Sequence, residues 1–325
     1  MKAVLCRVFG PPDQLEVAEV ATPEPKAGEV VIGVKACAVN FPDTLIIQGK
    51  YQFQPPLPFT PGTDVAGVVQ SVGVGVEGLA VGDRVLTLVM HGGYAEAVAC
   101  DARAVASIPD NVDFVTAAAF QMVYGTSYHA LVDRGRLQAG ETLLVLGAAG
   151  GVGLAAVELG KLLGARVIAA ASSAEKLEVC RQRGADEVID YSAEDLRERL
   201  KALAPRGVDL VFDPIGGALA EPALRGVGWG GRYLVVGFAA GDIPRIPLNL
   251  PLLKGCSVVG VFYGGFIMRE PGRSQANIRQ LLSWIAEGKI MPFISQTYPL
   301  ERAADALNAV IARRATGKLV LVMGA

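Results

Sequence analysis

The sequence predicts an α/β protein of two domains, one with a doubly wound parallel sheet and one built mainly from short β-strands. Three observations support this prediction. The 325 residues exceed what one hydrophobic core usually serves. The first part of the chain is rich in β-branched residues, glycine and proline, which is typical of short strands joined by turns. From about residue 121 onward, strands alternate with helices, as in a parallel sheet with crossover helices.

The N-terminal part is expected to be a compact, barrel-like β domain. Its predicted strands are residues 2–8, 29–39, 64–72, 84–89 and 93–99. The C-terminal tail departs from the strand–helix alternation, with predicted helices at 274–287 and 300–312 and predicted strands at 294–298 and 318–322. We therefore expect the tail to return to the β-rich domain. That domain is predicted to span residues 1–121 and 265–325, and the parallel-sheet domain residues 122–264.

The central part supplies the parallel sheet. Its predicted strands are residues 143–146, 166–171, 187–190, 208–213, 232–237 and 257–263, with helices at 154–164, 174–183 and 192–203. The last of these helices is predicted to begin at a Ser192 cap, because Asp195 follows three residues later. Six strands with crossover helices predict the doubly wound topology.

A glycine-rich turn between the first of these strands and its helix is the most informative motif. Residues 143–153 read LLVLGAAGGVG, so an apolar strand runs directly into the turn. A helix that starts there directs free N–H groups and its positive dipole end toward a bound pyrophosphate. The turn has the form Ala-x-Gly-x-x-Gly, with alanine in place of the usual first glycine. The predicted dinucleotide-binding residues are Ala148, Gly150, Gly151, Val152 and Gly153.

Composition excludes several other classes of protein. The formal net charge of −2 creates no global field for nucleic acid or anionic lipid, and no apolar run is long enough to span a membrane. The N-terminal segment resembles a short strand and not a signal peptide, so a soluble cytoplasmic protein is the expectation. The five cysteines form no CxxC pair, which argues against a disulfide framework and a cysteine-rich zinc site.

Taken together, these motifs carry a family resemblance. The stretches VNFPDTLIIQGKY, PGTDVAGVVQSVG, LGAAGGVG and GKLVLVM resemble the zinc-independent quinone oxidoreductases of the medium-chain dehydrogenase/reductase superfamily. The resemblance implies a Rossmann domain that binds NADPH, a GroES-like catalytic domain and a homodimer. Zinc-dependent relatives carry a cysteine at the position of Asn40 and a histidine at that of Thr63, so no metal site is expected.

The residues after the second Rossmann strand favour NADPH over NADH. An NAD enzyme usually presents an acid there to bind the ribose hydroxyls, whereas this chain has Ser172 and Ser173, with Lys176 one turn into the next helix. The resemblance implies that Ser172, Lys176, Tyr191 and Arg314 surround the 2′-phosphate. Taken singly, Lys176 is equally explained as a solvated helix charge and Ser172 as a helix cap.

The resemblance also places the catalytic residues. Asn40, Asp43 and Tyr51 are expected to line the pocket, with Thr126 near the nicotinamide. Asn40 can donate to a carbonyl that gains negative charge as hydride arrives. Tyr51 either donates a proton or covers the pocket, and Asp43 either caps a helix or acts as an acid. Leu45 stands where the family often has tyrosine, which makes the pocket less polar.

The expected function is NADPH-dependent hydride transfer to a quinone, a small-molecule substrate. The alternative is reduction of α,β-unsaturated carbonyls, whether enals, enones or enoyl and acryloyl thioesters of coenzyme A. A coenzyme A thioester would need a basic patch, for which the candidates are Arg245, Lys254, Arg269 and Arg273. Some family members are nucleic-acid-binding or lens structural proteins, but near-neutral charge and the lack of basic–aromatic clusters argue against a nucleic-acid partner.

Overall fold

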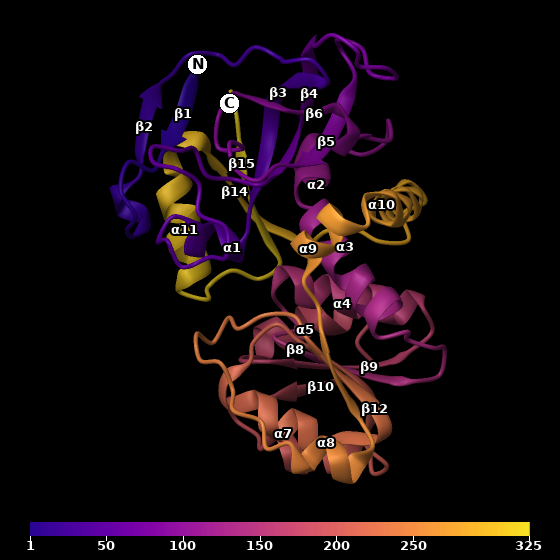
Figure 1. Cartoon of the computed structure of the whole chain (residues 1–325). Coiled ribbons are helices and arrows are strands. Elements are labelled where there is room, and N and C mark those ends of the chain that lie inside the picture. Colours follow the sequence, from indigo (N-terminus) through magenta and orange to yellow (C-terminus); the bar gives the residue numbers. More distant parts are fainter. Residues whose placement is uncertain (325) are drawn as a thin grey trace. The chain divides into compact units, whose positions relative to one another are not determined.

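The computed structural model describes residues 1–324 and divides the chain into two compact units (Figure 1). The first unit contains Met1–Met122 and the chain from Met291 onward, and the second contains Val123–Ile290. The tail therefore returns to the first unit, as its pattern predicts. Residues 265–290, which we predicted in the first unit, belong to the second, where Trp284 contacts the ring of Tyr128 and Asn277 donates to Asp133.

The first unit is organised around strand β3 (Glu29–Val39), which pairs antiparallel with β4 (Asp64–Val72), β6 (Ala97–Asp101) and β15 (Lys318–Val322). The sheet order is β14-β15-β3-β4-β5-β7, with β6 beside β3. The remaining elements of this unit are β1 (Lys2–Leu5), β2 (Glu16–Glu19), β5 (Arg84–Leu88), β7 (Val105–Ser107), β14 (Ile294–Pro299), α1 (Phe41–Ile46), α2 (Phe114–Ala118) and α11 (Ala303–Ile311).

Strand β3 is buried along both faces for most of its length. Its run of valine and isoleucine suits the extended backbone, and Lys35 is its one exposed residue. Side chains of β3, β4, β15 and α11 share one apolar core, which includes Ile32, Val65, Leu307 and Leu321. This core joins the N-terminal segment to the C-terminal return.

The second unit holds a six-stranded, fully parallel sheet in the order β10-β9-β8-β11-β12-β13, which confirms the doubly wound Rossmann topology. Its strands are β8 (Thr142–Leu146), β9 (Arg166–Ala171), β10 (Glu187–Asp190), β11 (Val208–Asp213), β12 (Val227–Val235) and β13 (Ser257–Gly260). Its helices are α4 (Gly151–Leu162), α5 (Ala174–Gln182), α6 (Leu196–Leu203), α7 (Ala220–Arg225), α8 (Asn249–Lys254), α9 (Tyr263–Arg269) and α10 (Pro271–Ala286); α3 (Gln121–Tyr128) begins at the division between the units.

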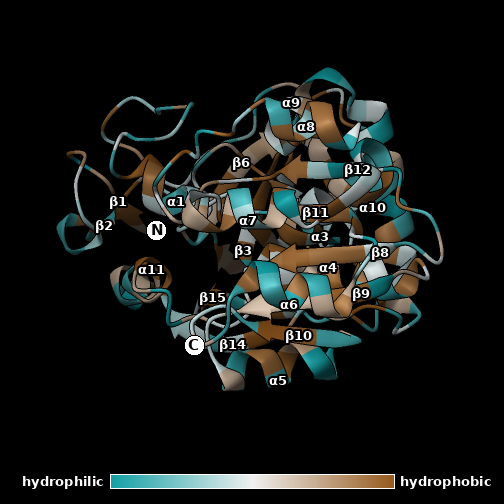
Figure 2. Ribbon diagram, turned by 90° about the horizontal axis from the view of Figure 1, so that it is seen from below, coloured by the Kyte–Doolittle hydropathy of each residue, from teal (hydrophilic) through white to brown (hydrophobic). Residues whose placement is uncertain are grey.

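Hydropathy follows this layering. Figure 2 shows β8, β9 and β10 largely in the brown of hydrophobic residues, whereas α6 carries teal, hydrophilic positions. In β8 the run from Leu143 to Leu146 is fully buried, because helices cover both faces of a doubly wound sheet. Continuous apolar strands of this kind predicted the sheet correctly.

Several predicted boundaries are wrong by a few residues. The helix expected from Ser192 begins at Leu196 with Asp195 as its cap, because the Ser192 hydroxyl donates instead to the carbonyl of Ser172. Strand β13 ends at Gly260 and not at residue 263, since its partner β12 ends at Val235. The strands predicted at 2–8 and 93–99 are observed at 2–5 and 97–101.

The close approach of β3 and β4 predicts a specific cost for a side chain at Gly67. A Cβ there would lie 2.1 Å from the backbone oxygen of Gly33, which cannot move away without distorting the sheet. Gly67→Ala is expected to lower the free energy of unfolding by roughly 1–3 kcal/mol in urea denaturation. The control is Gly272→Ala, where a Cβ meets nothing within 4 Å. Equal stability of the two variants would contradict this packing.

Candidate functional site

The glycine-rich turn joins β8 to α4 as the motif predicts. Gly150 is the N-terminal cap residue of α4, so the N–H groups of the first turn, from Gly151 to Gly153, have no intrahelical partner. Gly147 adopts a positive φ of 55°, which a side chain would strain. Since Gly147 makes the tight turn, alanine is tolerated at position 148, where the fingerprint usually has glycine.

The two remaining fingerprint glycines have different reasons to be glycine. A Cβ on Gly153 would lie 2.3 Å from the backbone oxygen of Gly147, so the helix can approach the strand only without a side chain. Gly150 has an ordinary φ of −77°, and a Cβ there would meet only that same oxygen at 3.4 Å. The fold alone does not require glycine at position 150, whereas close approach of a ligand to the backbone does.

A hydroxyl and an ammonium group meet at the carboxyl end of β9. The Nζ of Lys176 donates to the Oγ of Ser172 at 3.4 Å, and the backbone N–H of Tyr191 donates to Ala171 at 3.1 Å. These contacts bring the loops after β9 and β10 together. The cap of α5 is Ser173, whose hydroxyl accepts from the backbone of Lys176, so the helix does not need Ser172 as its cap.

Two further predicted residues, Thr126 and Arg314, belong to other segments of the chain. Thr126 is buried on α3, and its neighbour Ser127 donates to the carbonyl of Val152 at 2.8 Å, which ties α3 to the first turn of α4. Arg314 belongs to the first unit, where it is exposed after α11. Its contact with the 2′-phosphate stays a prediction.

The first unit contains a buried polar cluster, formed by Asn40, Asp43, Asp64, Tyr94 and Lys318, each at most 5% exposed. Asp43 Oδ2 accepts from the backbone N–H of Asn40 at 2.8 Å and from the hydroxyl of Tyr94 at 2.9 Å. Asp43 thus anchors the first turn of α1, which favours the structural over the acidic interpretation of this residue. Lys318 Nζ donates to Oδ1 of Asn40 at 2.5 Å and to the carbonyl of Val39 at 3.2 Å.

Burial controls the charges in the polar cluster. Burial raises the pKa of Asp43 to about 6. The hydrogen bonds from Asn40 and Tyr94 and the positive charge of Lys318 act in the opposite direction and offset part of this rise. Burial also raises the pKa of Asp64 to about 7, against Lys318 and the N–H of Met122. Burial lowers the pKa of Lys318, although the negative charges of Asp64 and Asp43 act to raise it. Tyr51 packs against the apolar core of the first unit. Burial raises the pKa of its phenol, and the negative charge of Asp43 adds a smaller increase.

Sequence reasoning did not select Lys318, Asp64 or Tyr94. Asp64 lies in the stretch PGTDVAGVVQSVG and Lys318 in GKLVLVM, which served only to recognise the family. A usable signal was present, because Lys318 directly precedes the apolar strand residues 319–322 and Asp64 precedes the apolar stretch 65–69. A charge at the start of a buried strand needs a polar partner, and these two charges lie in the same cluster.

Neither histidine is placed like a metal ligand. His129 stacks on the ring of Phe266 with centroids 3.9 Å apart and contacts Asp133 at 2.8 Å, and His91 lies beside the rings of Phe53 and Phe59. Across residues 1–324, no group of three or more histidine, cysteine, aspartate or glutamate side chains is arranged to hold a metal ion. The donors present therefore do not fit a zinc site.

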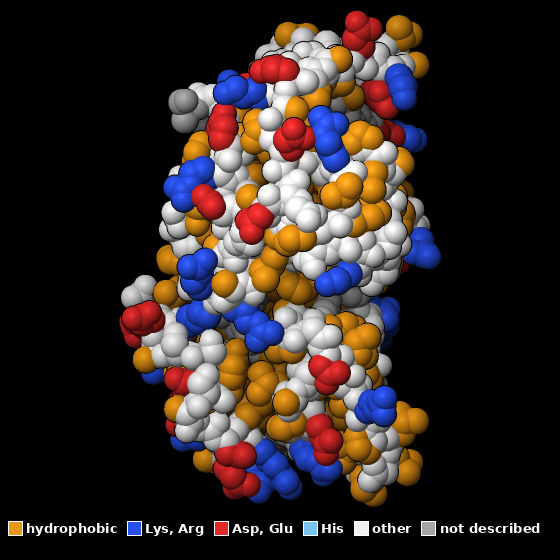
Figure 3. Space-filling view, turned by 90° about the vertical axis from the view of Figure 1, so that its left-hand side faces the viewer, with side chains coloured by type: hydrophobic (Ala, Val, Ile, Leu, Met, Phe, Trp, Pro, Cys, Tyr) orange, Lys and Arg blue, Asp and Glu red, His pale blue; other side chains and the backbone are white. Residues whose placement is uncertain are grey.

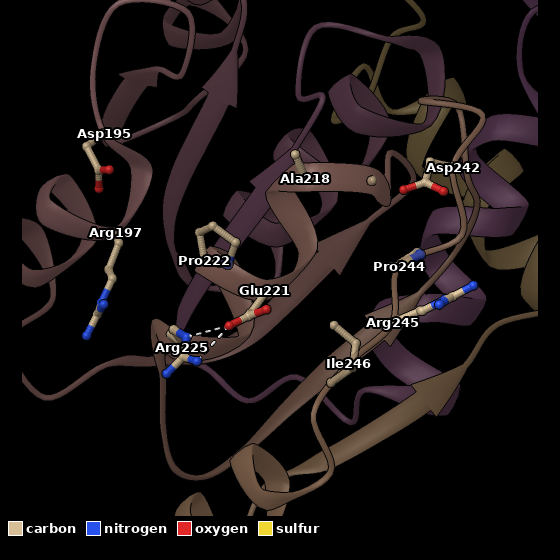
Figure 4. A pocket seen from close by; sticks show the side chains of 11 residues that line it. Asp195, Arg197, Ala218, Glu221, Pro222, Arg225, Asp242, Pro244, Arg245 and Ile246 are labelled. Carbon is tan, nitrogen blue, oxygen red and sulfur yellow. Dashed lines mark hydrogen bonds and ion pairs between the residues drawn. The ribbon is translucent and has the colours of Figure 1, made fainter.

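Two surface cavities of the second unit include basic residues considered for coenzyme A. One of about 470 Å³ lies between α6, α7 and the loop 242–246, where Arg245 and Asp242 are on one side and Arg225 pairs with Glu221 (Figure 4). The other, of about 260 Å³, is lined by Arg269 and Arg273 among others. Arg273 pairs with Asp133 and Glu270. Both cavities therefore mix acids with bases.

Comparison with protein families matches both units. Residues 26–110 match the alcohol dehydrogenase GroES-like domain, and residues 151–287 match the zinc-binding dehydrogenase family. The quinone oxidoreductase-like protein 2 homolog of Nematostella vectensis is 37% identical over 98% of this chain and 88% of its own. Human quinone oxidoreductase is 35% identical over 99% of this chain and 98% of its own. The chain belongs to the quinone oxidoreductase family of medium-chain dehydrogenases/reductases.

A solved structure agrees with this membership. Escherichia coli quinone oxidoreductase, crystallised with NADPH, superposes with a TM-score of 0.92 at 31% identity, covering 99% of this chain and 100% of that one. The chain is an oxidoreductase with a GroES-like and a Rossmann domain. No helix among residues 1–324 is both long and apolar enough to cross a membrane.

The buried Asp64 predicts an unusual dependence of stability on pH. Its pKa of about 7 in the native state lies above the reference value of 3.8, so the native state keeps a proton that the unfolded state has lost. Between these values the free energy of unfolding falls as pH rises. Asp64→Asn removes this titration, so its stability relative to wild type should increase from about pH 4 to pH 7 in urea denaturation.

The matched control for this measurement is Glu77→Gln, which changes an exposed acid of the same unit. Its stability should follow that of wild type across the same range. Parallel curves for Asp64→Asn and wild type would contradict the raised pKa of Asp64.

Proposed function

We propose that this chain is an NADPH-dependent reductase that delivers hydride to a quinone. The observation that carries the cofactor choice is the contact between Lys176 and Ser172 at the carboxyl end of β9. An acid in this place would bind ribose hydroxyls and repel a phosphate, whereas a hydroxyl and an ammonium group attract one. The E. coli relative crystallised with NADPH supports the same choice.

The glycine-rich turn would hold the pyrophosphate on the N–H groups of Gly151, Val152 and Gly153, where the α4 dipole favours negative charge. Ser172, Lys176, Tyr191 and Arg314 would hold the 2′-phosphate. Bound NADPH supplies the hydride. The chain's own contribution is to position the acceptor and to stabilise the charge that develops on its oxygen.

For the acceptor, we propose Asn40 as the donor to the substrate carbonyl. Its Nδ2 is buried and has no close hydrogen-bond partner among residues 1–324, only a weaker interaction with the Asp64 carboxyl. Thr126 and Tyr51 would line the site near the nicotinamide and the acceptor. Without a Lewis acid the oxidation of an alcohol lacks activation, whereas a quinone is already electrophilic.

A coenzyme A thioester is the less favoured acceptor, because its four candidate basic residues do not form one patch. Arg245 lines one cavity and Arg269 and Arg273 line another, while Lys254 donates to the carbonyl of Val227 at 2.7 Å. Small enals and enones need no such patch and stay the second candidate. Acidic and basic side chains are interspersed on the face shown in Figure 3, in keeping with a neutral small substrate.

The test of this function is steady-state oxidation of NADPH with a panel of benzoquinones and naphthoquinones, enals, enones and enoyl thioesters. The proposal expects the highest kcat/KM with quinones. A preference for enoyl thioesters by a factor of ten or more would replace it with the second function. No activity with any acceptor would overturn both.

Metal removal provides a further prediction. Because the donors do not fit zinc, overnight treatment with a strong chelator should leave kcat/KM and the melting temperature unchanged. The measurement pairs the assay with elemental analysis of the purified protein. Stoichiometric zinc that is lost together with activity would contradict metal independence.

Lys176→Ala tests the cofactor assignment. A charge-assisted contact is worth roughly 1.5–3 kcal/mol, so the variant should raise KM for NADPH by about one to two decades and leave NADH nearly unaffected. The effect should appear in KM because the phosphate binds ground and transition states alike. High salt should reduce it.

The control is Lys201→Ala on α6, where the lysine pairs with Glu198 and is exposed. It should change neither cofactor constant. A wild type that prefers NADH, or an equal loss for both cofactors in Lys176→Ala, would make Lys176 an ordinary helix charge.

We also propose a homodimer formed at strand β13, an edge of the Rossmann sheet. Apolar side chains are exposed on β13 and on the neighbouring β12 and α8, namely Val258 at 47%, Trp229 at 83% and Leu252 at 78%. The Trp229 ring packs beside Gly255, the residue that ends α8, and lies 3.4 Å from where a Cβ on this glycine would be. Trp229 and the end of α8 are therefore neighbours on the surface. Twin edges pair readily about a two-fold axis.

Val258→Arg should therefore convert a dimer into a monomer in light scattering at micromolar concentration, because two arginines would face each other across the axis. Val74→Arg, at an exposed valine of the first unit, should leave the dimer intact. A monomeric wild type would contradict this assembly.

A further inference from the structure

Lys318 is a buried cation whose hydrogen bonds go to uncharged groups. It begins β15, which pairs with β3 so that Leu319 lies opposite Val39. This register brings Nζ to the carbonyl of Val39 and to the side-chain oxygen of Asn40, at 3.2 and 2.5 Å. A buried ammonium needs hydrogen-bond acceptors, and its shortest contact is with the Asn40 amide.

This contact determines which way the Asn40 amide faces. An ammonium only donates, so the amide oxygen must point toward Lys318 and the NH₂ group away from it. Asn40 lies at the N-cap of α1 in a capping box with Asp43, but its side-chain oxygen makes no full capping hydrogen bond to the helix backbone. Lys318 holds the oxygen that would otherwise cap the helix.

The NH₂ group is left as a prepared donor. Nδ2 of Asn40 is buried and has no close hydrogen-bond partner among residues 1–324, only a weaker interaction with the Asp64 carboxyl, so it keeps the capacity to donate to another acceptor. A cation on the oxygen also polarises the amide, so that its N–H groups become stronger donors. The donor would bind an oxygen that gains negative charge more tightly than a neutral carbonyl.

We propose that Lys318 is a positioning residue for hydride transfer: it fixes and polarises the Asn40 amide so that Nδ2 donates to the acceptor oxygen of the substrate. This inference rests on the proposed function of Asn40. The competing explanation is that Lys318 only balances the charges of Asp43 and Asp64. The two explanations differ in whether Lys318 acts through Asn40.

A double-mutant cycle separates them. Asn40→Ala should lower kcat for quinone reduction by roughly 10²-fold, the usual loss for one preorganised donor. Lys318→Met should lower kcat by at least tenfold, with KM for NADPH unchanged, and should cause no further loss in the Asn40→Ala background. Lys35→Met, at the exposed lysine of β3, is the control and should match wild type. Additive losses from Asn40→Ala and Lys318→Met would overturn the inference.

Lys318→Met leaves two buried acids without their cation, which lowers its stability. If the variant cannot be purified, the whole cycle is run in the Asp64→Asn background. The expected and contradicting outcomes are the same there. If Lys318→Met keeps the wild-type kcat while Asn40→Ala loses it, only the role of Lys318 is overturned. The proposed function then remains.

A crystal structure of the Lys318→Met variant, or of its Asp64→Asn form, decides the positioning without any assay. We expect the Asn40 oxygen, which Lys318 no longer draws away, to complete a full hydrogen bond from the backbone N–H of Asp43, as an ordinary N-cap does. An unchanged Asn40 amide would overturn the inference even in an active enzyme. If wild type reduces no quinone, the proposed function fails, and this structural result still decides whether Lys318 positions the amide.

Discussion

The antiparallel pairing of β15 with β3 is the interaction on which the first unit depends. It joins the C-terminal return to the central strand of the β-rich sheet and brings Lys318 beside the end of β3. Strand β3 also pairs with β4 and β6, so three neighbouring strands fix its position. A residue that directly follows β3, such as Asn40, is therefore held on a rigid element, as a preorganised donor requires.

The polar cluster next to this pairing is costly to bury, so its presence indicates a role other than stabilising the fold. Two acids, a lysine and a tyrosine in an apolar unit reduce stability unless their hydrogen bonds are nearly complete. Here Oδ2 of Asp43 is bonded by Asn40 and Tyr94, whereas Nδ2 of Asn40 and one oxygen each of Asp43 and Asp64 lack a close partner among residues 1–324. Nδ2 is the donor among these incomplete groups, and it is the one that a substrate oxygen would complete. Gly150 of the Rossmann unit is comparable, because the fold would accept a side chain at this position and the glycine is explained better by a ligand that approaches the backbone.

Much of the fold could be predicted from sequence, because the relevant signals are local. The apolar run of β8, the glycine turn and the strand–helix alternation predicted the doubly wound parallel sheet. Capping was predicted less well, since Ser192 and Asp195 are both good caps and only the contact of Ser192 with Ser172 decides between them. The position of Lys318 before an apolar strand indicated that it needs a polar partner, but its partner Asn40 could not be predicted, because the two residues are far apart along the chain and meet only through the pairing of distant strands.

The central claim is that Asn40 stabilises the acceptor during hydride transfer and plays no part in holding the cofactor. The most direct measurement is the single-turnover rate of NADPH oxidation at saturating quinone, compared for wild type and Asn40→Ala, with NADPH deuterated at the transferred position in a parallel series. The account predicts an unchanged dissociation constant for NADPH, a rate that falls by roughly 10²-fold in the variant, and a primary isotope effect in that variant. An unchanged rate, or a loss confined to NADPH binding, would contradict it.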